Sequence, residues 1–350
     1  MPTMVDTVVL AAPRGFCAGV EMAIKALTWM VRVFPAPVYC YHEIVHNASV
    51  VETFERAGVT FVESIFDVPA GAPVMLSAHG SAPEVVAVAQ ERGCVMVDAV
   101  CPLVTKVHHE VRRRATDGFD IIYVGHRGHD EAVGTMAEAP AAVTIVDPEQ
   151  SLERFDPRDP GRVALVAQTT LGQFEWESVL ADARQRFPDL WTARRSDLCY
   201  ATTNRQEAVS ALAEGSDVVL VVGSENSSNT QALVRVSQGI GTPTYRVDGP
   251  DAVDPEWFAG AETVGVTAGA SAPDQSVRAV IESVGGGRVD VLRVTTEDEY
   301  FPLPPGLRVL LGALQAAVEG GYSARHPGRS GLLQDDHSWG AAEALDMLDG

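Results

Sequence analysis

The strongest constraint on the fold is a pattern that repeats along most of the chain. A short apolar run is followed by a polar cluster and then by a segment whose apolar residues have helical spacing. Most of the apolar runs are rich in valine and do not alternate with polar residues, which is typical of strands buried on both faces. This order of elements predicts an α/β protein with parallel strands. The seven predicted strands are residues 7–12, 73–77, 95–99, 120–125, 163–167, 217–223 and 263–267.

Composition limits the classes of function. The chain has 350 residues and a hydrophobic content of 46%, enough for two or three domains. Its formal net charge of -21 argues against non-specific binding of nucleic acid, because phosphate backbones attract basic surfaces. No apolar run approaches the roughly 18 residues that a membrane span needs. Residues 1–6 carry no basic patch ahead of an apolar run. We therefore expect a cytoplasmic protein with no nucleic-acid or membrane partner.

Three of the five cysteines lie at the start of a segment with helical spacing. Cys17 and Cys101 follow predicted strands, and Cys199 opens a third such segment. Thiolates at helix N-termini have lowered pKa values and are good ligands for iron or zinc. A single cysteine is more often a buried packing residue, and we interpret Cys40 and Cys94 in that way. Three cysteines in matching positions favour metal ligation.

The spacing of these three cysteines, 84 and 98 residues, predicts three comparable α/β units that each supply one ligand. A pseudo-threefold arrangement would bring the three together. The predicted units are residues 13–101, residues 102–195, and residues 196–302 completed by the strand in residues 1–12. Residues 303–350 are rich in Pro, Gly and acidic residues, and we expect a mobile tail in which residues 340–348 could form a short helix.

Several histidines could take part in chemistry. Residues 42–46 match the zinc-protease pattern H-E-x-x-H. That pattern requires a helix, whereas here it follows a strand-like run, so we interpret the match as accidental. His79, His126 and His129 lie just past predicted strands, which is better explained by contacts to an anion or a metal than by chance. Glu131 could donate a proton if its pKa is raised, although a lone glutamate is more often an exposed surface residue.

Two further clusters are rich in neutral hydrogen-bond donors. Residues 168–170 read Gln-Thr-Thr, and residues 223–230 read Gly-Ser-Glu-Asn-Ser-Ser-Asn-Thr. Such groups at helix starts can bind phosphate oxygens without Lys or Arg, and ordinary N-capping explains either cluster equally well. The chain has no G-x-G-x-x-G and no P-loop motif, so it shows no sign of a dinucleotide cofactor. Electrons for a redox reaction would have to come from outside.

These motifs together resemble the LytB family of 4-hydroxy-3-methylbut-2-enyl diphosphate reductases. The resemblance extends from residue 8 to about residue 300, in the order of the family. The matching strings are Pro-Arg-Gly-Phe-Cys-Ala-Gly-Val (13–20), His-Glu-Ile-Val-His-Asn (42–47), Ser-Ala-His-Gly (77–80), Cys-Pro-Leu-Val-Thr-Lys-Val-His (101–108), Gly-His-x-Gly-His-x-Glu (125–131), Gln-Thr-Thr-Leu (168–171), Cys-Tyr-Ala-Thr-Thr-Asn-Arg-Gln (199–206), Asn-Ser-Ser-Asn (226–229) and Thr-Ala-Gly-Ala-Ser-Ala-Pro-Asp (267–274).

The resemblance implies a trefoil of three pseudo-threefold-related α/β units with short parallel sheets around a central [4Fe-4S] cluster. It also implies that Cys17, Cys101 and Cys199 are the cluster ligands. Glu131 would deliver the proton, and Thr169 would help to position the substrate hydroxyl. The diphosphate and the substrate chain would be bound by His46, His79, His129, Thr169, Ser227, Ser228, Asn229 and Ser271.

The implied reaction is the last step of the non-mevalonate (MEP) isoprenoid pathway. Two electrons and protons would remove the allylic hydroxyl of the substrate as water, giving isopentenyl and dimethylallyl diphosphate. The family uses electron donors of the ferredoxin or flavodoxin type. Such donors are acidic, so docking would need a local basic patch, for which the arginine runs at 112–114 and 194–195 are candidates. Asp130 departs from the proline that is common in the family.

Two other interpretations remain at this point. A zinc hydrolase could use His42 and His46, but no third ligand stands at a recognisable spacing. An iron-sulfur sensor or scaffold would keep the three cysteines, but it would have no need for the set of Thr, Ser, Asn and His residues. That set favours an enzyme with a small-molecule substrate.

Overall fold

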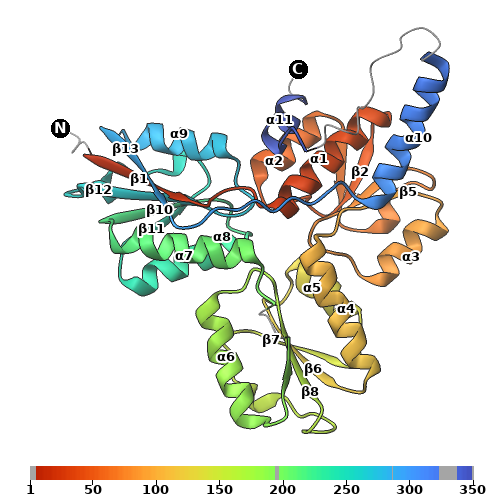
Figure 1. Cartoon of the computed structure of the whole chain (residues 1–350), viewed down its shortest axis with the longest axis horizontal. Helices are drawn as coiled ribbons and strands as arrows, with labels where there is room; N and C mark the ends of the chain where they lie inside the picture. The colour runs from red at the N-terminus through yellow and green to blue at the C-terminus, as the bar shows by residue number, and fades with distance from the viewer. Residues whose placement is uncertain (1–4, 194–196, 286, 323–336, 349–350) are drawn as a thin grey trace. The chain divides into compact units, whose positions relative to one another are not determined.

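The computed structural model describes residues 5–193, 197–285, 287–322 and 337–348, with the backbone alone for residues 318–322. The chain divides into two compact units, the first made of residues 1–17 and 103–298 and the second of residues 18–102 and 299–350. Helices and strands alternate, and the described strands form three parallel sheets (Figure 1). The predicted α/β class with three parallel sheets is therefore confirmed.

The larger sheet of the first unit combines the two ends of this unit's sequence. Its strand β1 lies between β12 and β13, so the first strand of the chain completes a sheet whose other strands come after residue 217. The order is β11-β10-β12-β1-β13, with every neighbouring pair parallel. The strands are β1 (Thr7–Ala12), β10 (Val218–Val222), β11 (Thr244–Val247), β12 (Thr263–Ala268) and β13 (Arg288–Arg293).

Helices cover both faces of this sheet (Figure 1). On one face, α7 (Tyr200–Glu214) and α8 (Ser228–Ile240) pack against alternate residues of β10. On the other face, the remaining residues of β10 pack against α9 (Asp274–Val284). Burial of each Val or Leu side chain contributes about 1.5–3 kcal/mol, which explains why β10 is apolar along its whole length.

The second sheet of the first unit has the order β7-β6-β8-β9 and is also parallel. One face is covered by α4 and α5, and the other by α6. The polar residues that follow β6 and β8 therefore lie at the same edge of this sheet. The elements are α4 (Pro102–Thr116), β6 (Asp120–Val124), α5 (Asp130–Ala137), β7 (Val143–Val146), β8 (Val163–Ala167), α6 (Gln173–Arg186) and β9 (Trp191–Thr192).

The second unit contains the third sheet, with the parallel order β3-β2-β4-β5. Buried residues of α3 pack against β4, and α10 lies beside β5. The elements are α1 (Ala18–Val33), β2 (Val38–Tyr41), α2 (Ala48–Arg56), β3 (Val59–Val62), β4 (Pro73–Leu76), α3 (Pro83–Glu91), β5 (Val95–Asp98) and α10 (Pro305–Tyr322).

The helix predicted near the C-terminus is present as α11 (Ala341–Asp346), and it packs against α1. The Glu21 carboxylate accepts a hydrogen bond from the Ala341 amide at 3.1 Å. The Trp29 and Trp339 rings meet edge to face at 6.1 Å between centroids, and the Lys25 ammonium lies 5.0 Å from the Trp339 ring. Residues 323–336 of the expected mobile tail lie outside the described residues.

All seven predicted strands are confirmed, with ends that differ by at most one residue. Of the described strands that the pattern did not predict, β3, β7, β9, β11 and β13 lie at a sheet edge. The sixth, β2, is an inner strand of four residues, which the sequence indicated only as a strand-like run. Edge strands bury only part of their surface, so they carry a weaker apolar signal. In the part of the chain that is described, no helix combines the length and the hydropathy that crossing a bilayer requires.

Candidate active site

Cys17 lies in a loop that leaves β1 and is tied by its backbone to the end of β12. The amide of Gly15 donates to the Ala268 carbonyl at 3.4 Å, and the amide of Cys17 donates to the Ala270 carbonyl at 3.3 Å. Gly15 has a φ of 65°, and a Cβ atom there would stand 3.1 Å from the Ala272 carbonyl oxygen. Glycine is needed at this position for both reasons. Cys17 then immediately precedes α1, as the sequence predicts.

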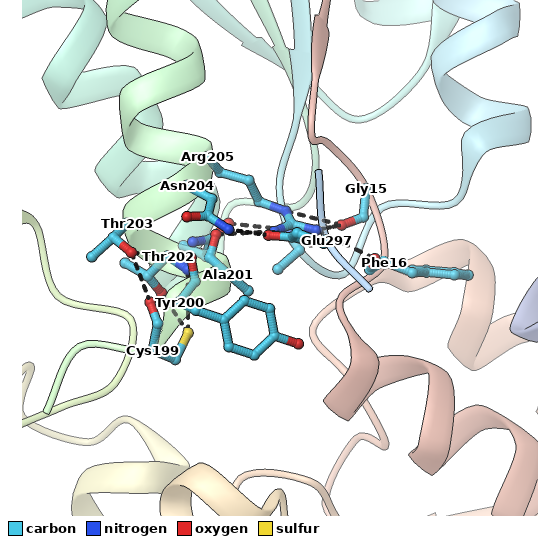
Figure 2. Close-up of polar contacts among 12 residues, drawn as sticks. Gly15, Phe16, Cys199, Tyr200, Ala201, Thr202, Thr203, Asn204, Arg205 and Glu297 are labelled. Atoms are coloured by element: carbon cyan, nitrogen blue, oxygen red, sulfur yellow. Dashed lines mark hydrogen bonds and ion pairs between the residues drawn. The ribbon is translucent and has the colours of Figure 1, made fainter. Parts of the chain in front are cut away.

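Cys199 is the N-cap of α7, and Gly215 is its C-cap. Its amide donates to the Thr169 carbonyl at 3.0 Å, and this bond ties α7 to the loop after β8. The Cys199 Sγ accepts a hydrogen bond from the Thr202 amide at 3.2 Å and lies 3.0 Å from the Thr202 hydroxyl (Figure 2). The prediction that Cys199 stands at the start of a helix is confirmed.

These two cysteines of the first unit are electrostatically coupled. The pKa of the Cys199 thiol is raised to about 11, mainly by burial and in addition by the charge of Cys17, while the hydrogen bonds from Thr202 and the charge of Arg205 oppose this shift. A thiolate pair in such surroundings needs a cation to be stable. Two soft sulfur donors, one of which accepts a backbone N–H bond at its sulfur, fit a thiophilic metal such as iron.

Cys40 and Cys94 behave as packing residues. Cys40 is fully buried in β2, and burial raises the pKa of its thiol. The Cys94 sulfur donates to the Pro69 carbonyl at 3.7 Å. Both environments agree with the prediction that Cys40 and Cys94 fill space.

Glu131 and Thr169 form a buried pair at the edge of the sheet that contains β6 and β8. Glu131 lies in the first turn of α5 and is 2% exposed, and Thr169 follows β8 and is 5% exposed. The Thr169 amide donates to Glu131 Oε1 at 2.7 Å, and the Thr169 hydroxyl donates to Oε2 at 2.9 Å. His129 is the N-cap of α5, and its Nδ1 accepts from the Glu131 amide at 3.2 Å. The sequence predicted all three as site residues, and the fold brings them together.

The environment of Glu131 keeps it about half protonated at pH 7. Burial raises the pKa of its carboxyl from 4.5 to about 7, although the two hydrogen bonds from Thr169 favour the ionised form and oppose the shift. The charge of His108 also lowers this pKa, and the charge of Asp197 raises it. A buried carboxylic acid with a pKa near 7 is suited to general acid catalysis. The expectation that a lone glutamate is exposed does not apply to Glu131.

The start of α8 provides a set of neutral donors. Ser227 is the N-cap, and its hydroxyl accepts from the Thr230 amide at 3.3 Å and from the Ser271 hydroxyl at 3.5 Å. Asn229 Oδ1 accepts from the Ala270 amide at 2.9 Å, next to the residues that hold Cys17. The Ser228 hydroxyl and Asn229 Nδ2 are buried and have no hydrogen-bond partner among the described residues. Unpaired buried donors at a helix N-terminus are suited to binding an anion.

The hydrogen bonds of the first unit join these residues into two groups. Thr169 contacts both Glu131 and Cys199, while Ala270 contacts both Cys17 and Asn229. Each group brings together residues that the sequence predicted at separate positions along the chain.

The other predicted residues belong to the second unit and form a group of their own. The Cys101 amide donates to the carbonyl of Ala78, the residue before His79, at 3.0 Å. The rings of His46 and His79 are stacked with centroids 4.0 Å apart, and His46 Nδ1 lies 3.3 Å from Glu43 Oε2. Cys101 directly precedes α4, whose first residue is Pro102.

The H-E-x-x-H match is accidental, as predicted. Residues 42–46 are not helical, His42 has a φ of 60°, and helix α2 begins only after the Asn47 N-cap. His42 and His46 therefore do not have the helical i,i+4 arrangement that a zinc protease needs. His46 instead stacks on His79.

Several buried charged residues near the predicted site were not predicted as site residues. Asp197 is 5% exposed and lies 3.9 Å from the Lys106 ammonium, and its pKa is raised to about 6 by burial. His108 Nδ1 lies 2.8 Å from the Glu138 carboxylate, with both side chains buried. Arg205 is fully buried on α7. His108 and Arg205 belong to strings that match the family, but the burial and the partners of all three residues are visible only in the structure.

The candidate docking patch on α4 is partly neutralised. Arg112 pairs with Glu138 at 3.4 Å, and Arg114 pairs with Glu110 at 3.7 Å. Arg114 also lies over the Trp191 ring at 4.5 Å. These arginines have structural partners, so the run is a weaker docking candidate than its sequence indicates. The second candidate, residues 194–195, lies outside the described residues.

Comparisons with known proteins identify the family of the chain. The model of the LytB protein family matches residues 8–285. The chain is 45% identical over 305 residues to 4-hydroxy-3-methylbut-2-enyl diphosphate reductase of Ralstonia nicotianae. The aligned region covers 86% of this chain and 94% of the relative. It is 48% identical to the enzyme of that name from Mycobacterium leprae, over 86% of this chain and 92% of the relative.

A solved structure gives the same result. The E-1-hydroxy-2-methyl-but-2-enyl-4-diphosphate reductase of Plasmodium falciparum is 30% identical, with a TM-score of 0.86 over 89% of this chain and 99% of that one. The family model spans most of the chain, and the relatives match nearly their whole length. The chain therefore belongs to the LytB family.

Proposed function

We propose that this protein is a 4-hydroxy-3-methylbut-2-enyl diphosphate reductase. It removes the allylic hydroxyl of its substrate as water, using two electrons and two protons, and it forms isopentenyl and dimethylallyl diphosphate. Relatives with this name match the chain at 45–48% identity over 86% of its length. The reaction is the last step of the non-mevalonate isoprenoid pathway.

The cofactor is one [4Fe-4S] cluster per chain, with Cys17, Cys101 and Cys199 as its ligands. Support for this assignment comes from the coupled thiols of Cys17 and Cys199 and from the hydrogen bonds at the Cys199 sulfur. Three thiolates leave one iron of a four-iron cluster without a protein ligand, so the bound cluster supplies electrons and a Lewis acid for the substrate oxygen. Cys101 has the same position, directly before a helix.

The diphosphate is bound by neutral donors. The unpaired Ser228 hydroxyl and Asn229 Nδ2 supply hydrogen bonds at the N-terminus of α8, and Ser227 and Ser271 extend the same group. His46, His79 and His129 complete the substrate-binding set, as the family resemblance implies. Hydrogen bonds to a charged group are each worth about 1.5–3 kcal/mol, so a few such donors suffice for specific binding.

Glu131 is the proton donor, and Thr169 works with it. When Glu131 is protonated, its O–H can donate to the Thr169 hydroxyl, which is then free to donate to the substrate oxygen. Transfer along this path delivers a proton to the leaving hydroxyl. Because the pair is buried and Thr169 is also bonded to Cys199, the proton is held beside the thiolate that we assign to the cluster.

The observation that carries this proposal is the buried Glu131–Thr169 pair with a carboxyl pKa of about 7. The test is anaerobic turnover of the substrate with a chemical reductant, comparing the iron-loaded wild type with Glu131→Gln. Glu149→Gln is the matched control, because Glu149 is exposed. We expect activity in the wild type and in the control, and a loss of about 100-fold or more in Glu131→Gln. An iron-loaded wild type without activity would refute the reductase assignment and favour a sensor or scaffold.

The electron donor is an external protein of the ferredoxin or flavodoxin type. This part of the proposal rests on the absence of a dinucleotide-binding motif from the sequence and on the family resemblance. A direct test is to replace the chemical reductant by a reduced ferredoxin or flavodoxin and to measure the same turnover.

A further inference from the structure

Arg205 is the largest fully buried side chain among the described residues, with an exposed fraction of 0%. It lies on α7, six residues after Cys199. A guanidinium group cannot be buried at low cost unless all its N–H groups have partners and its charge is compensated. A buried arginine in this position therefore needs a reason beyond packing.

The partners of Arg205 come from three segments that are far apart in the sequence (Figure 2). Its Nε and one terminal nitrogen donate to the Gly15 carbonyl at 3.1 and 2.8 Å, and that terminal nitrogen also donates to the Phe16 carbonyl at 3.3 Å. The other terminal nitrogen reaches both oxygens of the Glu297 carboxylate at 2.9 and 3.1 Å. That nitrogen also donates to the Ala201 carbonyl on α7 at 3.0 Å.

These bonds connect the two candidate ligand segments of the first unit. Gly15 and Phe16 directly precede Cys17, and Ala201 lies in the first turn of the helix that Cys199 caps. One rigid planar group thus fixes the loop of Cys17 relative to the helix of Cys199. Lysine has a single ammonium and cannot reach all these acceptors at once.

The charge of Arg205 is balanced by Glu297. Glu297 is 15% exposed at its side chain, and Asn204 Nδ2 donates to it at 3.0 Å, which holds the carboxylate against the guanidinium. Arg205 bonds to the backbone directly before Cys17 and to the first turn after Cys199. Any group bound by these two sulfurs would therefore lie in the field of the Arg205–Glu297 pair.

We propose that Arg205 is a positioning residue that sets the spacing of Cys17 and Cys199, and that the Arg205–Glu297 pair sets the electrostatic potential at the metal centre. This inference rests on the proposed function, because it takes the two cysteines as ligands of the iron-sulfur cluster. Reduction adds negative charge to a cluster, so a nearby positive charge raises its reduction potential and a nearby negative charge lowers it.

Removing the charge of Arg205 and removing the charge of Glu297 should therefore shift the midpoint potential in opposite directions. Arg205→Gln removes the positive charge and the bonds to Gly15, so the midpoint potential becomes more negative and the iron content per chain falls at least twofold. Glu297→Gln leaves the guanidinium uncompensated, so the potential becomes more positive while the Gly15 bonds remain. Arg205→Lys keeps the charge but cannot span the acceptors, so its iron content falls with a smaller shift in potential.

The experiment is anaerobic reconstitution of the full chain, with iron and sulfide assays and a redox titration followed by EPR. Arg288→Gln is the control, because Arg288 is exposed and forms an ion pair of 2.8 Å with Asp290 on β13. We expect wild-type iron content and potential in this control. Circular dichroism verifies that each variant is folded, and if Arg205→Gln does not fold, Arg205→Lys and Glu297→Gln still decide the question.

Potentials that shift in the same direction in the Arg205→Gln and Glu297→Gln variants, or not at all, would overturn the inference. If the wild type binds no cluster, the inference and the proposed cofactor both fail. If the wild type binds a cluster but does not convert the substrate, the proposed reaction alone fails, and the iron content and potentials of the variants still test the role of Arg205.

Discussion

The pH dependence of turnover tests the assignment of Glu131 most directly. A carboxyl with a pKa of 4.5 is protonated in about 0.3% of molecules at pH 7, whereas one with a pKa of about 7 is protonated in about half of them. Burial of Glu131 therefore increases the proton-loaded fraction about 160-fold, which corresponds to about 3 kcal/mol. We expect kcat/KM to be constant below about pH 6 and to fall about tenfold per pH unit above pH 7, as the acid ionises.

A substitution outside the Glu131–Thr169 pair should shift the pH profile in a known direction. The charge of His108 lowers the pKa of Glu131, so His108→Gln should raise that pKa and move the alkaline limb of the profile to higher pH. His109→Gln is the control, because His109 is exposed on the same helix. Anaerobic turnover between pH 5.5 and 9 is the assay. An alkaline limb that stays in place in His108→Gln would show that His108 does not act on Glu131, and a wild-type profile that is flat through pH 8.5 would refute the role of Glu131.

Three further predictions concern the metal, the anion and the C-terminal helix. Cys199→Ala should lose most of its iron, while Cys94→Ala should keep it; iron assays after anaerobic reconstitution compare the two. Asn229→Ala should raise KM for the diphosphate about tenfold, the equivalent of about 1.4 kcal/mol, with a smaller change in kcat. Gln238→Ala, exposed on the same helix, is its control in steady-state assays. Trp339→Ala should lower the free energy of unfolding by about 1–3 kcal/mol, because it removes the contacts of α11 with Trp29 and Lys25; thermal unfolding measures the loss.

The sequence predicts the buried strands well and the edge strands poorly, for a physical reason. β10 and β8 are covered on both faces, so all five of their residues are apolar and stand out. β13 lies at a sheet edge and alternates Arg, Asp and Leu with valines that are half exposed. Its pairing with β1 depends on a strand almost 300 residues away, which no local pattern records.

The same distinction applies to the candidate site. Cys17, Cys101 and Cys199 could be found from sequence because each directly precedes a helix, and the predicted helix starts are confirmed. Glu131 was identified as the proton donor only by the family resemblance. Its burial is not visible in the sequence, and its partner Thr169 follows a different strand. Arg205 belongs to a string that matches the family, but its pairing with Glu297 could not be predicted, because 92 residues separate the two.

A chain with a net charge of -21 has to bind an anion without help from its overall field. The donors of the candidate anion site at the start of α8 are hydroxyls and an amide, so they carry no charge. Binding by such short-range donors depends weakly on ionic strength, because salt screens separated charges far more than direct hydrogen bonds. We therefore expect KM for the diphosphate to change less than threefold between 0.05 and 0.5 M salt, whereas a site built on Lys or Arg would weaken by an order of magnitude or more.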